Sequence, residues 1–192
     1  MYNFFAYMSR MKLIRRWSLM KAADEENVAE HSAQVAQMAH ALALIANRYY
    51  GADINADRIT TLALYHESSE VITGDLPTPI KYYNPQIRTA YKDIEAIANR
   101  KLLGMLPEDL AMDYAPIIEQ DIGTHEKRLI KAADKLSAYV KCVEELKRGN
   151  REFAKAATAL KQEVKSYFDL PEVKYFYDNF LPAFSKTLDE LD

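Results

Sequence analysis

The sequence predicts an all-α protein, and three observations carry this prediction. Nearly half of the 192 residues are apolar, yet no stretch alternates apolar and polar residues as a half-buried strand does. Apolar residues instead recur every three or four positions over long segments, which is the period of a helix with one buried face. There are only five glycines, and capping residues or prolines precede several of these segments. The length suits one domain, so residues 1–192 are expected to form a single unit.

The overall charge and the single cysteine limit the possible function classes. The formal net charge is −3, which gives no general attraction to nucleic acid backbones or to anionic membranes. Cys142 stands alone, which excludes an internal disulfide framework and is typical of a reducing compartment. No apolar run approaches the roughly 20 residues of a membrane span, and the first residues lack the charged segment of a signal peptide. We therefore expect a cytoplasmic protein that binds neither membranes nor nucleic acid polymers.

A first helix is expected over residues 3–15, where apolar residues have helical spacing. It leads into Arg15-Arg16-Trp17, and two interpretations of this triplet are open. The arginines are either solvated beside a core tryptophan, or they form a fork for a phosphate beside an aromatic wall for a base or sugar.

The second helix is expected from Val28 to about Arg48, with Asn27 as its N-cap. His31 belongs to the buried face of this helix, together with Val28, Val35, Met38, Leu42 and Ile45. His40 lies nine residues after His31 and about half a turn away, so the two histidines are not expected in one site. A histidine on an apolar face is usually a hydrogen-bonded core residue, so His31 becomes a ligand only if another helix brings a second ligand to it.

A third helix is expected to begin at Asn55-Ala56-Asp57 and to end at Gly74. If it is continuous, it carries His66 and Glu70 inward on one face, whereas Glu67 is turned by about 100°. Pro77 and Pro79 then keep the next loop extended. This loop either presents Asp75 and Thr78 to a ligand or only connects two helices.

Four further segments are predicted from caps, prolines and helical spacing. One helix runs from Asn84-Pro85 to about Leu103 with Tyr91, Ile94 and Ala98 on its apolar face, and a shorter helix after Leu106-Pro107-Glu108 is interrupted by Pro116. Thr124 is expected to cap a helix to about Leu146, and another amphipathic helix covers residues 152–168. The apolar tail after it either closes the core or forms a subunit interface, through Phe176, Tyr177, Phe180, Leu181, Phe184 and Leu188.

Three of these helices carry candidate metal ligands, namely His31, His66 with Glu67, and Asp134. Two imidazoles with carboxylates suit a borderline divalent transition metal such as Mn, Co, Fe or Zn. Asp134 lies at the edge of an apolar face and also has a second possible role, because it can form a salt bridge with Lys135 or Arg128. The spacing of these residues along the chain is by itself only a weak signal.

Short motifs around these residues strengthen the signal. They are Glu30-His31-Ser32, Tyr65-His66-Glu67, Ser69-Glu70-Val71, Gly74-Asp75-Leu76-Pro77-Thr78-Pro79 and Lys131-Ala132-Ala133-Asp134. In this order they resemble the HD-domain metal-dependent phosphohydrolases and, more narrowly, the bacterial 5′-deoxynucleotidases. The resemblance also includes Arg15-Arg16-Trp17, Glu26-Asn27-Val28 and Leu181-Pro182-Ala183-Phe184, so it spans essentially the whole chain.

The resemblance implies an HD-domain helical bundle, commonly a homodimer, that hydrolyses deoxyribonucleoside 5′-monophosphates to deoxynucleosides and phosphate. It implies that the metal ligands are His31, His66, Glu67 and Asp134, holding Co, Mn, Fe or Zn. It also implies that Glu70 is catalytic and handles the proton of the attacking water.

The resemblance further implies how the substrate is held. Arg16 would bind the phosphate, Trp17 would wall the sugar and disfavour a 2′-hydroxyl, and Asp75 would take the 3′-hydroxyl. Thr78, in the same loop as Asp75, is expected to contact the substrate as well. We find no set of residues dedicated to reading a base edge, so all bases are expected to be accepted.

The chain departs from the family at position 67, where glutamate stands in place of aspartate. The extra methylene moves the carboxylate by roughly 1.5 Å, whereas metal–ligand distances tolerate changes of only ~0.2 Å. A glutamate still ligates through another rotamer. The alternative is a metal-poor, catalytically weak nucleotide-binding or sensor protein on the same fold, and a third possibility is a purely structural helical dimer.

Overall fold

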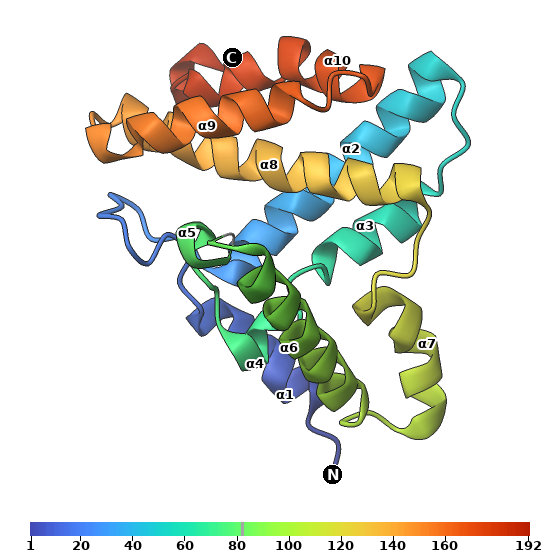
Figure 1. The fold of residues 1–192 in the computed structure, drawn as a ribbon. Coiled ribbons are helices and arrows are strands. Elements are labelled where there is room, and N and C mark those ends of the chain that lie inside the picture. The colour runs from blue at the N-terminus through green and yellow to red at the C-terminus, as the bar shows by residue number, and fades with distance from the viewer. Residues whose placement is uncertain (82) are drawn as a thin grey trace.

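The computed structural model describes residues 1–81 and 83–192, and every regular element in these ranges is a helix (Figure 1). This confirms the all-α prediction. The α-helices are α1 (Phe4–Met8), α2 (Val28–Tyr50), α3 (Ala56–Leu64), α4 (Glu70–Thr73), α5 (Thr78–Lys81), α6 (Pro85–Leu103), α7 (Glu108–Ile118), α8 (Thr124–Lys147), α9 (Ala154–Lys165) and α10 (Pro171–Asn179). The 3₁₀ helices are η1 (Ser9–Leu13), η2 (Arg151–Phe153), η3 (Leu181–Ser185) and η4 (Leu188–Glu190). Among the described helices, none combines the length and the hydrophobicity that crossing a membrane requires.

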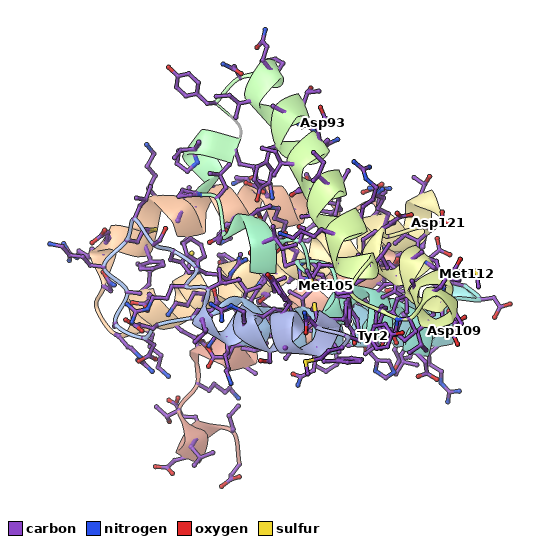
Figure 2. All side chains as sticks on the ribbon, turned by 90° about the horizontal axis from the view of Figure 1, so that it is seen from below. Tyr2, Asp93, Met105, Asp109, Met112 and Asp121 are labelled. Atoms are coloured by element: carbon purple, nitrogen blue, oxygen red, sulfur yellow. The ribbon has the colours of Figure 1, made fainter. Side chains whose placement is uncertain are left out.

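Two larger apolar clusters organise these helices, and a third, around Cys142, Phe153 and Ala157, packs against Trp17. The larger cluster lies among α2, α3, α8, α9 and α10, and Leu42, Leu62 and Leu136 are fully buried in it. The smaller cluster joins α1, α6 and α7 through Phe4, Leu102 and Ile118. Figure 1 shows α8, α9 and α10 on one side of the molecule and α1, α4 and α6 on the other. Figure 2 views this second side, where α6 carries Asp93 and α7 carries Asp109 and Met112.

Helix α2 begins and ends as its sequence predicts. The Asn27 side chain accepts a hydrogen bond from the backbone N–H of Glu30 at 3.0 Å, and the Glu30 carboxylate accepts one from the backbone N–H of Asn27. This reciprocal capping satisfies two backbone donors that would otherwise lack helical partners. Gly51 ends the helix with a φ of 70°, a left-handed conformation that glycine adopts without strain. The predicted apolar face is buried, and His31 is fully buried with it.

The predicted third helix is wrong in one respect, because it is broken in the middle. Helix α3 ends at Leu64 and α4 begins at Glu70, and residues 65–69 between them form turns. Two side chains take up backbone carbonyls here: His66 Nδ1 lies 2.6 Å from the Ala63 oxygen, and the Ser68 hydroxyl donates to the Tyr65 oxygen at 2.6 Å. Such local side-chain bonds compete with the helical ladder. His66 and Glu70 therefore do not share the face of one continuous helix.

The structure corrects smaller expectations as well. The first helix becomes 3₁₀ at Ser9 and ends at Leu13, because the backbone of Ile14 turns extended and accepts a hydrogen bond from the Val28 N–H. Pro116 lies inside α7 without interrupting it, although it lacks the N–H that would bond to the carbonyl of Met112. Gly123, not Thr124, is the N-cap of α8.

Two segments expose apolar side chains that the sequence predicts to be buried or to form a subunit interface. Ile94 of α6 is 49% exposed although it belongs to the predicted apolar face. In the C-terminal segment, Phe176 and Leu181 close the larger cluster, whereas Phe180 and Leu188 are exposed. Core closure is thus the role of part of this segment.

Candidate metal centre and active site

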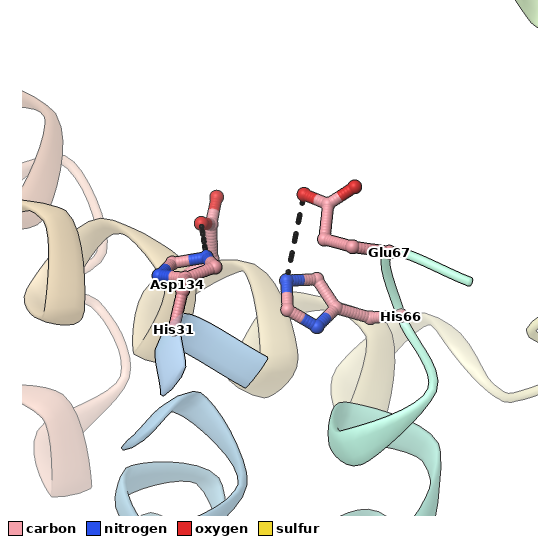
Figure 3. A group of neighbouring side chains, drawn as sticks. All are labelled: His31, His66, Glu67 and Asp134. Carbon is pink, nitrogen blue, oxygen red and sulfur yellow. Dashed lines mark hydrogen bonds and ion pairs between the residues drawn. The ribbon is translucent and has the colours of Figure 1, made fainter. Parts of the chain in front are cut away.

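The four predicted metal ligands lie together. His31 comes from α2, His66 and Glu67 from the turns between α3 and α4, and Asp134 from α8, and each offers one ligand atom within 4.8 Å of the others (Figure 3). The Nε2 of His31 lies 3.1 Å from Oδ1 of Asp134, and the Nε2 of His66 lies 3.6 Å from Oε1 of Glu67. Donors about 2.1 Å from a common ion lie about 3 Å apart when adjacent and about 4.2 Å apart when opposite. The separations are therefore close to those of a metal coordination sphere.

The break after α3 explains how two consecutive residues serve one site. Ile59 and Leu62 pack α3 into the larger apolar cluster, whereas Val71 and Ile72 pack α4 against the smaller one. The turns that join them cross the boundary between the clusters and face α2 and α8. On a regular helix Glu67 would point about 100° away from His66, but here its carboxylate reaches the same group.

His66 is arranged as a neutral ligand. Its Nδ1–H donates to the Ala63 carbonyl at 2.6 Å, so the proton sits on Nδ1 and a lone pair faces the group from Nε2. This Nε2 is buried and has no hydrogen-bond partner among the described residues. Burial lowers the pKa of His66, which keeps the imidazole neutral. A buried lone pair without a donor is costly, and a bound cation would satisfy it.

His31 is oriented by a hydrogen-bond relay from α8 back to α2. The Ser137 hydroxyl donates to Oε1 of Gln34 at 2.6 Å, so its lone pair faces Nδ1 of His31 at 3.1 Å. Nδ1 then carries a proton, and Nε2 lies 3.1 Å from Oδ1 of Asp134, on the side that would face a metal. An outer partner that fixes the tautomer of a ligating histidine is a regular feature of metal sites.

Replacing Ser137 with alanine should lower the affinity for a divalent transition metal by about 10- to 100-fold, because His31 loses the acceptor that fixes its tautomer. Competition between the protein and a metal chelator measures this change. Ser32→Ala is the matched control, since Ser32 is equally buried on α2 and its hydroxyl has no partner among the described residues. Equal affinities of both variants would contradict this role of Ser137.

Charge around the group also fits a divalent cation. Burial opposes ionisation of Asp134, but the hydrogen bond from His31 and the charge of Lys135 hold its pKa well below the ordinary value. Burial and the repulsion from Asp134 oppose ionisation of Glu67, but its interaction with His66 and the charges of Lys81 and Arg16 outweigh them and lower its pKa. Both carboxylates are thus ionised at neutral pH. Two anionic oxygens and two imidazole nitrogens make a donor set that suits Mn, Co, Fe or Zn.

Glu70 begins α4 directly behind Glu67 and is only 2% exposed. Its Oε2 has no hydrogen-bond partner among the described residues. Burial and the neighbouring carboxylates Glu67 and Asp75 raise the pKa of Glu70 to about 10. At neutral pH Glu70 therefore holds a proton when no cation is near. A divalent cation held by Glu67, three residues earlier, would lower this pKa and free the carboxylate to accept a proton from water.

The residues of Arg15-Arg16-Trp17 differ in their exposure. Arg15 is exposed and pairs with Glu25 at 2.9 Å. Arg16 is largely buried, and its Nε donates to Oε2 of Glu26 at 3.0 Å. The indole Nε1–H of Trp17 donates to the same oxygen at 2.8 Å, and its ring lies 5.3 Å from that of Phe153. Arg16 is therefore not a solvated arginine.

Arg16 lies near enough to the candidate metal ligands to interact with their charges. Burial opposes its positive charge, but Asp134, Glu26, Glu67 and Asp75 together raise the pKa of the guanidinium. Burial raises the pKa of Asp75, while the charge of Arg16 opposes this rise. The structure thus gathers Arg16 and Asp75 around the four candidate ligands. The side chain of Thr78, at the start of α5, lies outside the described part of the structure.

Sequence reasoning missed several residues near the group. Lys81 of α5 forms an ion pair with Glu95 at 3.2 Å, and its Nζ lies 4.7 Å from the centre of the Tyr91 ring. Burial opposes the charge of Lys81, but the nearby Glu67 carboxylate helps to raise its pKa. Ser137 had a signal, because it lies one helical turn after Asp134 and so on the same face. Glu26 belongs to the motif Glu26-Asn27-Val28 of the resemblance, but it lies in a loop without periodicity, so its contacts with Arg16 and Trp17 could not be inferred. The other two histidines lie outside the metal group: His40 is half-buried on α2, and His125 pairs with Glu172 at 3.3 Å.

Comparisons with known proteins agree with this geometry. The model of the 5′-deoxynucleotidase YfbR-like family matches residues 3–184. 5′-Deoxynucleotidase VV1113 of Vibrio vulnificus is 53% identical over 190 residues, which cover 98% of this chain and 97% of the relative. 5′-Deoxynucleotidase YfbR of Escherichia coli (strain K12 / DH10B) is 52% identical over 190 residues, which cover 98% and 95%.

Solved structures with low sequence identity show the same fold. An HD-domain phosphohydrolase from Listeria innocua has a TM-score of 0.83 at 24% identity, covering 95% of this chain and 88% of that one. The HD phosphohydrolase DatZ of cyanophage S-2L, solved with dA and one catalytic Zn²⁺ ion, has a TM-score of 0.64 at 18% identity. It covers 92% of this chain and 95% of its own.

Proposed function

Since this chain belongs to the YfbR-like 5′-deoxynucleotidase family, we propose that it is a metal-dependent phosphomonoesterase of deoxyribonucleoside 5′-monophosphates. The products are a deoxynucleoside and inorganic phosphate. The observation that carries the proposal is the Nε2 lone pair of His66, which is buried without a partner among the described residues and faces three further ligand atoms. Such a group is costly unless a cation occupies it.

The four ligands proposed for the metal are His31, His66, Glu67 and Asp134. When bound, a divalent transition metal supplies Lewis acidity, which lowers the pKa of a coordinated water and polarises a phosphoryl oxygen. The dA and catalytic Zn²⁺ of the cyanophage enzyme support this metal class and a deoxyribose in the substrate. The carboxylates around the group outnumber its cationic side chains, so a phosphate dianion would be repelled without added positive charge.

The chain's own residues perform the proton transfer and hold the substrate. Glu70 takes a proton from the attacking water at its unpartnered Oε2 as the new P–O bond forms. The bond between phosphorus and the 5′-oxygen then breaks, and Glu70 returns the proton to that oxygen. Arg16 holds the phosphate with the donors that Glu26 leaves unused. Trp17 walls the sugar, and Asp75, which a phosphate would repel, takes the 3′-hydroxyl. Thr78 is the further substrate contact that we propose.

The glutamate at position 67 favours ligation over a lost metal site. Its carboxylate lies 3.6 Å from the His66 Nε2 and within the group of four ligand atoms. The relatives at 52–53% identity are named as 5′-deoxynucleotidases, which favours an enzyme over a metal-poor sensor. The proposal therefore keeps Glu67 as a ligand.

Phosphate release by metal-stripped protein tests the proposed function. We expect turnover of deoxyribonucleoside 5′-monophosphates after addition of Mn, Co, Fe or Zn, and none in the presence of chelator. Ribonucleoside 5′-monophosphates should react more slowly. Absence of turnover with every metal, together with nucleotide-induced thermal stabilisation, would instead identify a nucleotide-binding protein.

The proposal includes a cytoplasmic homodimer. The single Cys142, which has no second cysteine in the chain to form a disulfide with, supports the location. Exposed apolar side chains on α1, α6 and α7 support a second copy as a partner, since Phe5, Ile97 and Met112 are each more than half exposed.

A further inference from the structure

A single carboxylate oxygen joins the two side chains at the proposed phosphate and sugar positions. Oε2 of Glu26 accepts the Nε–H of Arg16 at 3.0 Å and the Nε1–H of Trp17 at 2.8 Å. The Arg16 and Glu26 side chains are only 13% and 12% exposed. We call these three residues the Arg16–Glu26–Trp17 cluster. Charge-assisted hydrogen bonds at low exposure hold their partners firmly.

The backbone sets Glu26 opposite Arg16. Arg15 and Asn27 form an isolated antiparallel bridge, the Arg16 N–H donates to the Glu26 carbonyl at 2.9 Å, and the Val28 N–H donates to the Ile14 carbonyl at 3.0 Å. One residue further out, Arg15 and Glu25 form an equivalent ion pair that is about 70% exposed on each side. The same short ladder therefore holds one buried arginine–glutamate pair and one solvated pair.

The hydrogen bonds of the cluster fix Arg16 and Trp17 while leaving part of each side chain available to a ligand. Glu26 uses the Nε–H of Arg16, so both terminal nitrogens of the guanidinium stay available for bidentate contact with a phosphate. Trp17 has a φ of 58°, which a bulky residue adopts only when its surroundings impose it. The hydrogen bond to Glu26 and the contact with Phe153 are those surroundings.

The loop that returns from Trp17 to Glu26 is fixed by a second buried carboxylate. Glu145 of α8 is 1% exposed and accepts the backbone N–H groups of Ala23 and Asp24 at 2.8 and 3.2 Å. Lys141 and Asn150 donate to the same carboxylate. The loop therefore holds Glu26 in place before a ligand binds.

We propose that Glu26 is a positioning residue for substrate specificity, which sets the phosphate-binding arginine and the sugar-facing tryptophan through one shared oxygen. The inference rests on the proposed function, because it takes Arg16 to hold the phosphate and Trp17 to wall the sugar. Both side chains donate to the same Glu26 oxygen, so a phosphate that shifts Arg16 also shifts the indole of Trp17. Discrimination against a 2′-hydroxyl thus depends on a residue that touches no substrate.

Glu26→Gln tests the proposal and Glu25→Gln is its matched control. Glutamine keeps the size of the side chain and one accepting oxygen but carries no charge, so the hydrogen bonds from Arg16 and Trp17 lose the charge assistance that holds both side chains. We expect Glu26→Gln to raise KM for dAMP about tenfold with a smaller change in kcat, and to lower the dAMP-to-AMP ratio of kcat/KM about tenfold. Glu25→Gln should keep both values.

The single tryptophan of the chain gives a readout that does not need activity. Trp17 emission should shift in Glu26→Gln and stay unchanged in Glu25→Gln. Arg16→Lys should also shift it without any ligand, because lysine lacks the Nε–H that shares the Glu26 oxygen. This last measurement remains decisive if Glu26→Gln does not fold.

The outcomes separate this inference from the proposed function. A wild-type protein without metal-dependent turnover of dAMP would overturn the proposed function. Wild-type turnover with an unchanged KM and dAMP-to-AMP ratio in Glu26→Gln would overturn only the role of Glu26. An equal loss in Glu25→Gln, or an Arg16→Lys protein with wild-type emission, would overturn it as well.

Discussion

Replacing Glu70 with glutamine is expected to lower kcat by about 10²- to 10⁴-fold, with little change in KM. The carboxylate is almost completely buried, its Oε2 has no partner among the described residues, and its pKa is raised to about 10 by burial, Glu67 and Asp75. Glutamine has the same shape but cannot take a proton from water. Steady-state phosphate release from a deoxyribonucleoside 5′-monophosphate, with saturating metal, measures the loss.

Two controls separate a lost proton acceptor from a damaged fold. The melting temperature of Glu70→Gln should equal or exceed that of the wild type, because a neutral amide replaces a buried acid that is costly to ionise. Asp93→Asn, which changes an exposed acid on α6 outside the group of candidate metal ligands, should keep full activity. If Glu70→Gln retained a near-wild-type kcat, another group would have to accept the proton.

The second large effect is expected for His66→Ala, which removes the ligand atom that the fold leaves without a partner among the described residues. Turnover should fall by about 10³-fold or more, because the activated water depends on a bound metal. Elemental analysis of protein purified without chelator should find clearly less metal per chain than in the wild type.

His40→Ala is the matched control for this loss. His40 lies on α2 like His31 but is half-buried and stands outside the metal group. This variant should bind metal and turn over substrate as the wild type does. A His66→Ala protein that kept its metal and its activity would show that the ion binds elsewhere.

Residues whose positions depend on local rules could be predicted from the sequence. Asn27 begins α2 because its side chain caps the backbone of Glu30, and the apolar period of α2 then places His31 in the core. The same logic gives Asn84 and Pro85 at the start of α6. Local capping and helical period are written in neighbouring residues, so one sequence is enough to read them.

Contacts that depend on tertiary structure could not be predicted in this way. The break between α3 and α4 arises where His66 and Ser68 bond to backbone carbonyls, which leaves no trace in the apolar period. The pairing of Arg16 with Glu26 depends on a loop, and that loop depends on Glu145, more than 100 residues further on. No period or cap connects such residues. The roles of the site residues in catalysis remain predictions.

The hydrogen bonds that connect the N-terminal loop to α8 have a consequence for the order of events during translation. His31 meets Asp134 across 103 residues, and Ala23 meets Glu145 across 122. At synthesis rates of about 5–20 residues per second, the first half of the site leaves the ribosome about 5–20 seconds before the second. During that interval the nascent chain contains His31 without Asp134, and Trp17 without Phe153. The N-terminal residues of the active site are therefore the first to be made and among the last to reach their final positions.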